Sequence, residues 1–283
     1  MPITTRRLSN ALGAEILGAD LAKSLSNSEF DEIHRTFLER GILLFRKQKI
    51  TREQHIAFSR RFGELDRHDS LPRDRHPDYP ELLLVTNIPE EGGKESASKY
   101  TGQQWHSDMS FTLEPSLGSL LRGITIPPVG GDTMFTNMYL AYETLSDGMK
   151  KMIEPLHGIH TGRRKVTDPN AAREREQAAI NPPIAQPLVR VHPETGRKAL
   201  YIGEKVSRLV GMTPEESKPI IDYLVKHATR PQFVYRHQWQ QDDIVLWDNR
   251  CTMHIALGDY EEGEIRHLER TTVKGTPSGY YLQ

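Results

Sequence analysis

Residues 105–111 read WHSDMSF and place an imidazole, His106, two positions before a carboxylate, Asp108. Side chains alternate between the two faces of a β-strand, so a strand here would direct both groups to the same side. Two polar groups on one face of an otherwise apolar run are costly to bury unless something binds them. The stretch therefore has two interpretations: the edge of a surface hairpin with a His–Asp hydrogen bond, or two ligands of a metal ion.

The composition excludes several classes of protein. The 283 residues suit one large domain or two small ones, and we expect a single domain over residues 1–283 because no repeat or low-complexity linker divides the chain. With 37 basic and 38 acidic residues, the chain lacks the charge excess that binding to nucleic acid or an anionic membrane requires. No apolar run approaches the roughly 20 residues of a membrane-spanning helix. One cysteine and the lack of a secretory signal predict a cytoplasmic protein.

Short strands dominate the predicted secondary structure. Candidate strands cover residues 42–46, 81–86, 118–126, 132–138, 187–192, 232–239, 243–249 and 266–275. Helices are predicted over residues 27–41, 51–63 and 213–228. Strands separated by Gly/Pro turns, with a few flanking helices, favour a sandwich or jelly roll over a doubly wound sheet. The polar loops 87–104 and 161–183 are interpreted equally well as lids over a site or as disordered segments.

A third candidate metal ligand is His254, which follows the predicted strand 243–249. Two histidines and one carboxylate on one face leave about three coordination positions open, and this is the ligand set of non-haem Fe(II) oxygenases. Zinc accepts the same ligands, so the set alone does not identify the metal.

Two arginines that follow His254 suggest what the open positions are for. Arg266 and Arg270 are four residues apart, so they share one face of a strand, which can lie beside the strand of His254. Inward guanidinium groups need anions, and their fork shape suits a carboxylate or a sulfonate. The alternative is two surface arginines paired with Glu264 and Glu269, which we would prefer if the histidines and the aspartate were absent.

Four motifs in this order resemble the taurine/2,4-dichlorophenoxyacetate dioxygenase family. They are WHSD (105–108), GGDT (130–133), WDNRCTMH (247–254) and the arginines of IRHLERTTVKG (265–275). The likeness extends along the chain through GAEILGADL (13–21), AFSRRFG (57–63) and TTVKG (271–275). It implies a mainly β fold with flanking helices, the double-stranded β-helix or cupin-like jelly roll, and the use of Fe(II), 2-oxoglutarate and O2.

The resemblance also implies roles for single residues. By position, His106, Asp108 and His254 match the iron ligands of the family. Thr133 and Arg266 match the residues that bind the distal carboxylate of 2-oxoglutarate. None of these five positions departs from the family pattern.

The substrate residues follow the family less closely. Arg270 matches the arginine that binds the anionic end of the substrate, and His68 lies where the taurine enzyme has a second anion contact. The tyrosine and asparagine of the taurine pocket would fall near Leu71 and Gly102, and the segment 259–265 is one residue longer. The pocket should therefore be roomier and more apolar, which suits a sulfonate, an alkyl sulfate ester or an aryloxyalkanoate better than taurine.

The function expected is that of a 2-oxoglutarate-dependent dioxygenase that hydroxylates a small organic anion and converts 2-oxoglutarate to succinate and CO2. A zinc-dependent hydrolase or lyase on a cupin-like barrel would explain the ligands but leave Thr133, Arg266 and Arg270 without a shared purpose. A non-catalytic sensor of small anions is the third interpretation, although such a relative should lose a metal ligand first. Neither nucleic acid nor a membrane is an expected partner, and a homo-oligomer, as dimer or tetramer, is left open.

Overall fold

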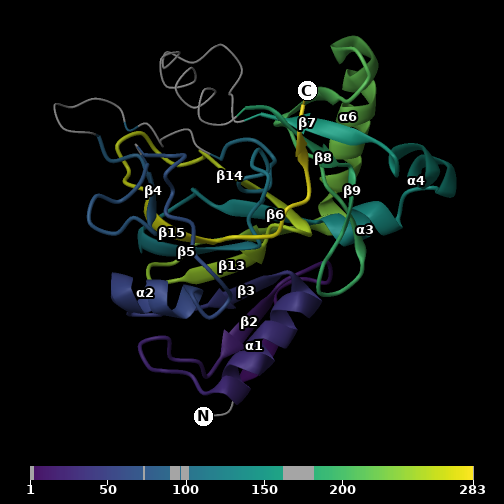
Figure 1. The fold of residues 1–283 in the computed structure, drawn as a ribbon. Helices are drawn as coiled ribbons and strands as arrows, with labels where there is room; N and C mark the ends of the chain where they lie inside the picture. Colours follow the sequence, from purple (N-terminus) through teal and green to yellow (C-terminus); the bar gives the residue numbers. More distant parts are fainter. Residues whose placement is uncertain (1–2, 73, 90–95, 97–101, 162–181, 283) are drawn as a thin grey trace.

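One large, mostly antiparallel sheet runs through the middle of the protein (Figure 1). The computed structural model describes residues 3–72, 74–89, 96, 102–161 and 182–282. In spatial order, the seven strands of this sheet are β1 (Thr4–Arg7), β2 (Ala14–Leu17), β3 (Ile42–Phe45), β13 (Ile244–Asp248), β5 (Gly118–Thr125), β15 (His267–Val273) and β4 (Leu83–Thr86). Only the β2–β3 pair is parallel.

Three smaller sheets complete the β structure. A three-stranded sheet has the order β12 (Val234–His237), β6 (Thr133–Asn137) and β14 (Thr252–Ala256). A four-stranded sheet has the order β11 (Val206–Leu209), β7 (His157–His160), β8 (Ile184–Pro187) and β16 (Tyr280–Tyr281). The remaining pair is β10 (Lys198–Leu200) and β9 (Val189–Val191). Every strand predicted from the sequence overlaps one of these observed strands, and the protein is mainly β with flanking helices, as predicted.

The alternation of side chains along β13 builds two hydrophobic cores. Ile244 and Leu246 point to one face of the large sheet, where they pack with Phe37 of the first helix. Val245 points to the other face and packs with Phe135 of β6. The three-stranded sheet therefore lies against the face of the large sheet that is opposite to α1.

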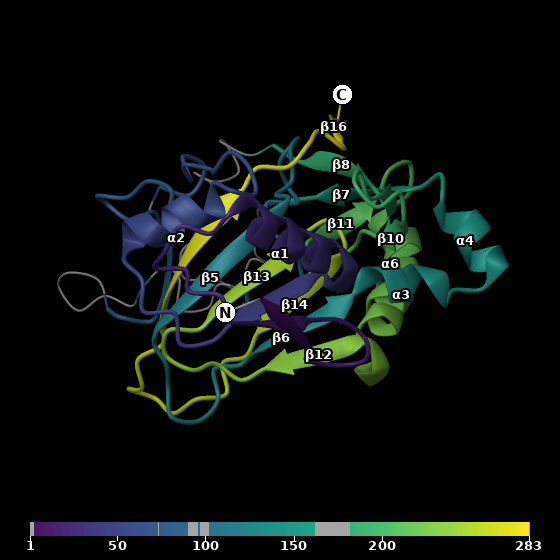
Figure 2. The same cartoon turned by 90° about the horizontal axis from the view of Figure 1, so that it is seen from below.

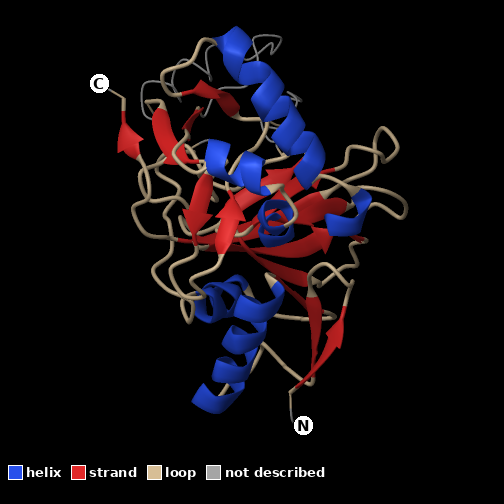
Figure 3. Cartoon of the chain, turned by 90° about the vertical axis from the view of Figure 1, so that its right-hand side faces the viewer, coloured by secondary structure: helices blue, strands red, loops and turns tan. Residues whose placement is uncertain are grey.

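Helices cover the outside of these layers. They are α1 (Asn27–Arg40), α2 (Arg52–Ser59), α3 (Met138–Glu143), α4 (Asp147–Ile153), α6 (Pro214–Ala228) and the short 3-10 helix η1 (Pro231–Phe233). Seen from below, α1 and α2 lie across the large sheet (Figure 2). Figure 3 shows α6 on the opposite side of the strands from α1. None of the described helices is long and apolar enough to span a lipid bilayer.

The predicted helices are confirmed, with one boundary wrong. The capping box of Thr51 and Gln54 starts α2 as expected, but α2 ends at Ser59 and residues 60–63 form turns. The predicted helix 27–41 is α1, which ends at Arg40 and is capped by Gly41, whose φ of 68° is the left-handed conformation that glycine adopts at low cost. Of the two predicted polar loops, residues 90–95, 97–101 and 162–181 lie outside the described part of the chain.

Candidate active site

The three candidate metal ligands converge between the three-stranded and the seven-stranded sheets. His254 lies on β14, and its backbone exchanges two hydrogen bonds with His106, with N···O distances of 2.8 and 3.0 Å. Asp108 Oδ1 lies 3.7 Å from His106 Nε2 and 3.9 Å from His254 Nε2. All three side chains are buried, and one ligand atom of each lies within 4.8 Å of the others. One ion could contact all three residues.

The route by which the chain brings these residues together differs from the expected one. Residues 105–111 are not a strand: His106 forms a single bridge with His254, and residues 108–111 form a turn in which Met109 has a φ of 52°. Alternation along a strand therefore does not explain why His106 and Asp108 meet. The bridge positions the first ligand, and the turn after it positions the second.

The protonation states of the three side chains suit a divalent cation. Burial lowers the pKa of His254 to about 4 and holds the pKa of His106 well below its usual range, so both imidazoles are neutral near pH 7. Burial alone would raise the pKa of Asp108, but the charge of Arg270 and the hydrogen bond from Ser119 bring it below its usual value. Two neutral imidazoles and a carboxylate are the forms in which these residues bind metal ions. The donor set therefore fits the predicted iron.

Hydrogen bonds from neighbouring residues hold the candidate metal ligands in their orientation. His106 Nδ1 donates to the backbone oxygen of Gln104 at 2.6 Å, which leaves Nε2 as the nitrogen with a free lone pair. Ser119 Oγ donates to Asp108 Oδ2 at 2.7 Å, and the Asp108 backbone N–H donates to Asn249 Oδ1 at 3.0 Å. Asn249 also donates to Ser119 Oγ at 3.0 Å. Asn249 and Ser119 were not predicted, although Asn249 belongs to the motif WDNRCTMH.

We expect Asn249→Ala to weaken metal binding by about 10- to 100-fold, because outer partners of this kind orient the ligands. The measurement is a titration of the apoprotein with Fe(II) or Mn(II) under anaerobic conditions. The control is Asn10→Ala, which removes an exposed asparagine outside the site. Equal metal affinity in the Asn249 variant and the wild type would contradict a positioning role.

Arg266 and Thr133 lie close together, and Thr133 pairs with Ala256 of the strand that carries His254. Arg266 Nε donates to the Gly131 backbone oxygen at 2.8 Å, and Nη2 lies 3.5 Å from Thr133 Oγ1. Trp239 Nε1 also donates to Thr133 Oγ1, at 3.0 Å. Arg266 is buried and forms no ion pair among the described residues, and burial lowers its pKa to about 10. A buried guanidinium that is still charged at pH 7 and lacks a carboxylate partner suits an anionic ligand.

Arg270 lies directly against the metal ligands. Its Nη1 donates to Asp108 Oδ1 at 2.5 Å, and its Nε has no hydrogen-bond partner among the described residues. His68 lies nearby, because it contacts Thr272 of the strand that carries Arg270, and burial and the charge of Arg270 lower its pKa to about 4. His68 Nδ1 is 3.3 Å from the Pro80 backbone oxygen and Nε2 is 3.1 Å from Thr272 Oγ1. In this neutral ring Nδ1 donates and Nε2 accepts, so Nε2 can donate to an anion only after the ring changes its tautomer or takes up a proton.

The expected position of the strand that carries the arginines is wrong. The strand β15 that carries Arg270 pairs with β5 and β4, not with the His254 strand β14. Arg270 thus reaches the site from the large sheet and Arg266 from the residue just before β15, while His254 reaches it from the three-stranded sheet. The surface alternative also fails, because both arginines are buried and Glu269 binds Arg52 instead, at 2.6 Å.

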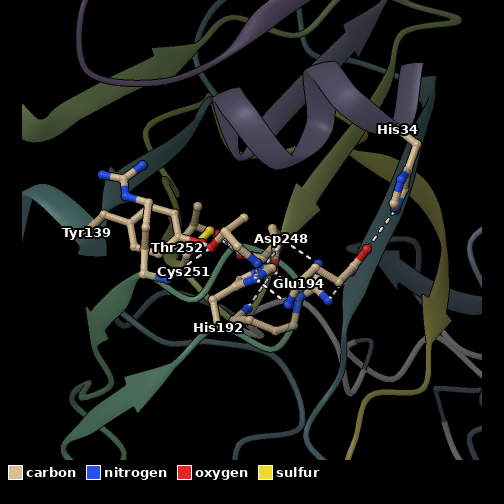
Figure 4. A network of polar contacts seen from close by, with 10 residues as sticks. His34, Tyr139, His192, Glu194, Asp248, Cys251 and Thr252 are labelled. Carbon is tan, nitrogen blue, oxygen red and sulfur yellow. Dashed lines mark hydrogen bonds and ion pairs between the residues drawn. The ribbon is translucent and has the colours of Figure 1, made fainter. Parts of the chain in front are cut away.

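A second group of metal-binding residue types, His192, Asp248 and Cys251, lies outside this site (Figure 4). Arg250 donates from Nε to Asp248 Oδ1 at 2.8 Å and from Nη2 to Oδ2 at 2.7 Å, and His192 Nε2 donates to Oδ2 at 3.0 Å. Burial raises the pKa of the Cys251 thiol, so no thiolate forms near pH 7. Arg250 already neutralises the charge of Asp248. We therefore interpret this group as a hydrogen-bonded cluster that stabilises the turn between β13 and β14, and not as a metal site.

Comparison with known proteins identifies relatives along the whole chain. The family model described as "Taurine catabolism dioxygenase TauD, TfdA family" matches residues 4–272. The chain is 34% identical over 284 residues to the alpha-ketoglutarate-dependent 2,4-dichlorophenoxyacetate dioxygenase of Cupriavidus pinatubonensis, covering 96% of this chain and 98% of that protein. It is 33% identical over 279 residues to an alkylsulfatase of Acinetobacter baylyi, covering 95% and 84% respectively.

A solved structure matches at the level of the fold. The crystal structure of AAD-2 in complex with Mn(II) and N-oxalylglycine superposes with a TM-score of 0.83 at 32% sequence identity. The match covers 98% of this chain and 99% of the other.

Proposed function

Since the chain belongs to the taurine catabolism dioxygenase TauD, TfdA family, it is an α-ketoglutarate-dependent dioxygenase that uses Fe(II) and O2, and we propose that it hydroxylates a small organic anion. The candidate substrates are sulfonates, alkyl sulfate esters and aryloxyalkanoates, because the relatives include a 2,4-dichlorophenoxyacetate dioxygenase and an alkylsulfatase. The observation that carries the proposal is the convergence of a His–Asp–His set with two buried arginines. A zinc hydrolase and a non-catalytic sensor gain no support from these relatives.

The proposed iron ligands are His106, Asp108 and His254. If they bound iron, they would fill part of its coordination sphere and would leave the other positions for 2-oxoglutarate and O2. With 2-oxoglutarate, the bound iron supplies an oxidation in which one atom of O2 enters a substrate C–H bond and the other enters succinate, with release of CO2. The protein itself holds the reactants in place and limits the access of water.

Arg266 and Thr133 are proposed to bind the distal carboxylate of 2-oxoglutarate. The guanidinium is anchored through Nε on the Gly131 carbonyl, so its Nη atoms remain available for a carboxylate. A Cβ added at Gly131 would lie 3.1 Å from Arg266 Cδ, so even an alanine there would be in close steric contact with the arginine side chain. Glycine at this position keeps the side chain of Arg266 in its place.

Arg270 and His68 are proposed to bind the anionic end of the substrate. The contact between Arg270 and Asp108 places the guanidinium beside the metal ligands, so an anion bound there would hold its adjacent carbon near the iron. Hydroxylation of the carbon next to a sulfonate, sulfate ester or ether oxygen gives a hemiacetal-like product. That product breaks down to an aldehyde or oxoacid and releases sulfite, sulfate or a phenol.

Arg270→Leu should lower kcat/KM for anionic substrates by at least about 30-fold, because truncating one partner of a buried charge pair costs roughly 2–5 kcal/mol. The slow consumption of 2-oxoglutarate without substrate should be spared. Both rates are measured as succinate release, with Arg270→Lys as the variant that keeps the charge. If neutral analogues are turned over as well as anionic ones, the role of Arg270 is wrong.

The proposed activity is tested by measuring succinate release with alkanesulfonates, alkyl sulfates and phenoxyalkanoates, together with the sulfite, sulfate or phenol produced. One class should raise succinate release above the substrate-free rate, with about one equivalent of its product. Stimulation by none of the three classes would contradict the proposed substrate.

We further propose that the opposed sheets form a double-stranded β-helix within one domain over residues 1–283. The packing of β6 against β13 through Phe135 and Val245 supports this arrangement. A cytoplasmic location and a dimer or tetramer stay predictions, which fractionation of cells and light scattering would test.

A further inference from the structure

Trp239 is a buried aromatic residue that directs the single polar atom of its side chain at the proposed cosubstrate site. It belongs to the hydrophobic core that also contains Phe135, Val245 and Trp247. Its Nε1 donates a hydrogen bond to Thr133 Oγ1 at 3.0 Å. Trp239 was not predicted as a site residue, and neither the metal ligands nor the proposed substrate residues explain this contact.

The pairing of two strands brings Trp239 to Thr133. His237, the last residue of β12, is paired with Thr133, the first residue of β6. Directly opposite residues of an antiparallel pair point to the same face, and a residue two positions farther along lies diagonally within reach of a long or aromatic side chain. Trp239 holds this diagonal position. The His237 ring meets the Trp239 ring at 88°, with 4.6 Å between the ring centroids, and packs against its side.

The hydroxyl group of Thr133 lies between two groups that can only donate hydrogen bonds. An indole N–H and a guanidinium group have no acceptor, whereas a threonine hydroxyl has one hydrogen to donate and two lone pairs. Trp239 Nε1 and Arg266 Nη2, at 3.0 and 3.5 Å from Thr133 Oγ1, therefore both use this oxygen as an acceptor. The hydroxyl hydrogen itself has no acceptor among the described residues, although Thr133 is buried. A buried donor of this kind is expected to meet an acceptor.

We propose that Trp239 is a positioning residue of the 2-oxoglutarate site: by occupying one lone pair of Thr133 Oγ1, it turns the threonine hydroxyl hydrogen toward the distal carboxylate. The inference rests on the proposed function, in which Thr133 and Arg266 bind that carboxylate. An ionised carboxylate only accepts hydrogen bonds, so it matches a hydroxyl group that is left only to donate. Hydrogen bonds to an ionised partner are also stronger than those between neutral groups. The arrangement thus selects a cosubstrate with an ionised distal end over one that ends in a methyl group.

Trp239→Phe tests this role, because phenylalanine keeps an aromatic ring in the core but removes the N–H. The dissociation constants of 2-oxoglutarate and 2-oxopentanoate, which has a methyl group in place of the distal carboxylate, are measured by calorimetry on protein loaded with Mn(II). The variant should bind 2-oxoglutarate roughly 3- to 10-fold more weakly, which is the effect of one hydrogen bond of ordinary strength. Its affinities for 2-oxopentanoate and for Mn(II) should equal those of wild type.

Two further measurements separate the N–H from the shape of the side chain. A second variant carries benzothienylalanine at position 239, which has sulfur in place of the indole N–H, and it should behave as Trp239→Phe does without leaving a cavity. In steady-state kinetics with Fe(II), KM for 2-oxoglutarate should rise by the same factor, and kcat at saturating 2-oxoglutarate should be unchanged, because the lost interaction contributes to binding alone.

A double-mutant cycle with Thr133→Val shows whether Trp239 acts through the threonine hydroxyl group. Valine is of similar size but lacks the hydroxyl, so Trp239→Phe should weaken 2-oxoglutarate binding no further in the Thr133→Val protein. The matched control is Tyr235→Phe, which removes a hydroxyl group that is hydrogen-bonded to His237 and not to Thr133. This control should bind both acids as wild type does.

The outcomes distinguish this inference from the proposed function. If the variants at position 239 bind 2-oxoglutarate as tightly as wild type, or bind both acids more weakly by the same factor, the positioning role is wrong and the proposed function stands. The role is likewise overturned if the effects of Trp239→Phe and Thr133→Val on 2-oxoglutarate binding simply add. If Thr133→Val and Arg266→Ala both leave the affinity for 2-oxoglutarate unchanged, the cosubstrate binds elsewhere, and this inference fails together with that part of the proposed function.

Discussion

His106→Ala is expected to abolish Fe(II) binding and turnover together. Loss of an outer partner of a metal ligand typically costs 10- to 100-fold in affinity, so removal of a ligand should cost more than about 100-fold. The neutral, buried ring of His106 has its Nε2 directed toward Asp108, and no other described histidine besides His254 approaches that carboxylate as closely as 4.0 Å. Asp108 and His254 are already ligands in this assignment, so neither can take the place of the His106 imidazole.

The measurement is the visible charge-transfer band that Fe(II) and 2-oxoglutarate form together in the absence of O2. The band should be missing in His106→Ala and present in the control His157→Ala, which changes a histidine at the other end of β7 from His160. Circular dichroism shows whether the variant is folded. A folded variant that binds Fe(II) and 2-oxoglutarate normally would refute the ligand assignment.

Arg266→Ala should raise the 2-oxoglutarate concentration needed for half-maximal activity by roughly 150- to 5,000-fold. Removing one partner of a buried ion pair costs about 3–5 kcal/mol, and about 1.4 kcal/mol corresponds to a factor of ten. The variant leaves the ligand carboxylate beside Thr133 without a charged partner. Steady-state kinetics at varied 2-oxoglutarate measure the change.

Arg266→Lys is the matched control for charge. A lysine keeps the positive charge but cannot form the two parallel hydrogen bonds of a guanidinium, so recovery should be partial. Fe(II) affinity should be normal in both variants, because Arg266 is not a metal ligand. An unchanged requirement for 2-oxoglutarate in Arg266→Ala would show that the cosubstrate binds elsewhere.

Local structure was predicted well because it depends on neighbours in the sequence. The capping boxes at Thr51 and Thr213 start α2 and α6 where they were expected, since a side-chain oxygen satisfies a free N–H of the first turn. The end of α2 was predicted four residues late, at Gly63. Residues 60–63 form turns although the sequence pattern there still allows a helix.

Long-range pairing was predicted less well. The sequence predicts one strand through Arg266 and Arg270, but β15 begins at His267. The sequence contains no local signal that β15 pairs with β5 and β4 and leaves β14 to another sheet. The partners of a strand depend on the packing of the whole sheet and not on its own propensity. For the same reason, the hydrogen bonds of Asn249 and the hydrogen-bonded cluster around Asp248 were not predicted.

The sequence by itself determined the chemical groups of the site: two imidazoles, a carboxylate and two guanidinium groups, on residues whose types suit Fe(II) and organic anions. Only the tertiary structure decided how they meet. A backbone bridge pairs His106 with His254, a turn returns Asp108 to them, and β15 supplies Arg270 from the opposite sheet. Residue types fix charge and coordination chemistry, whereas distances between residues far apart in the chain exist only once the sheets have packed.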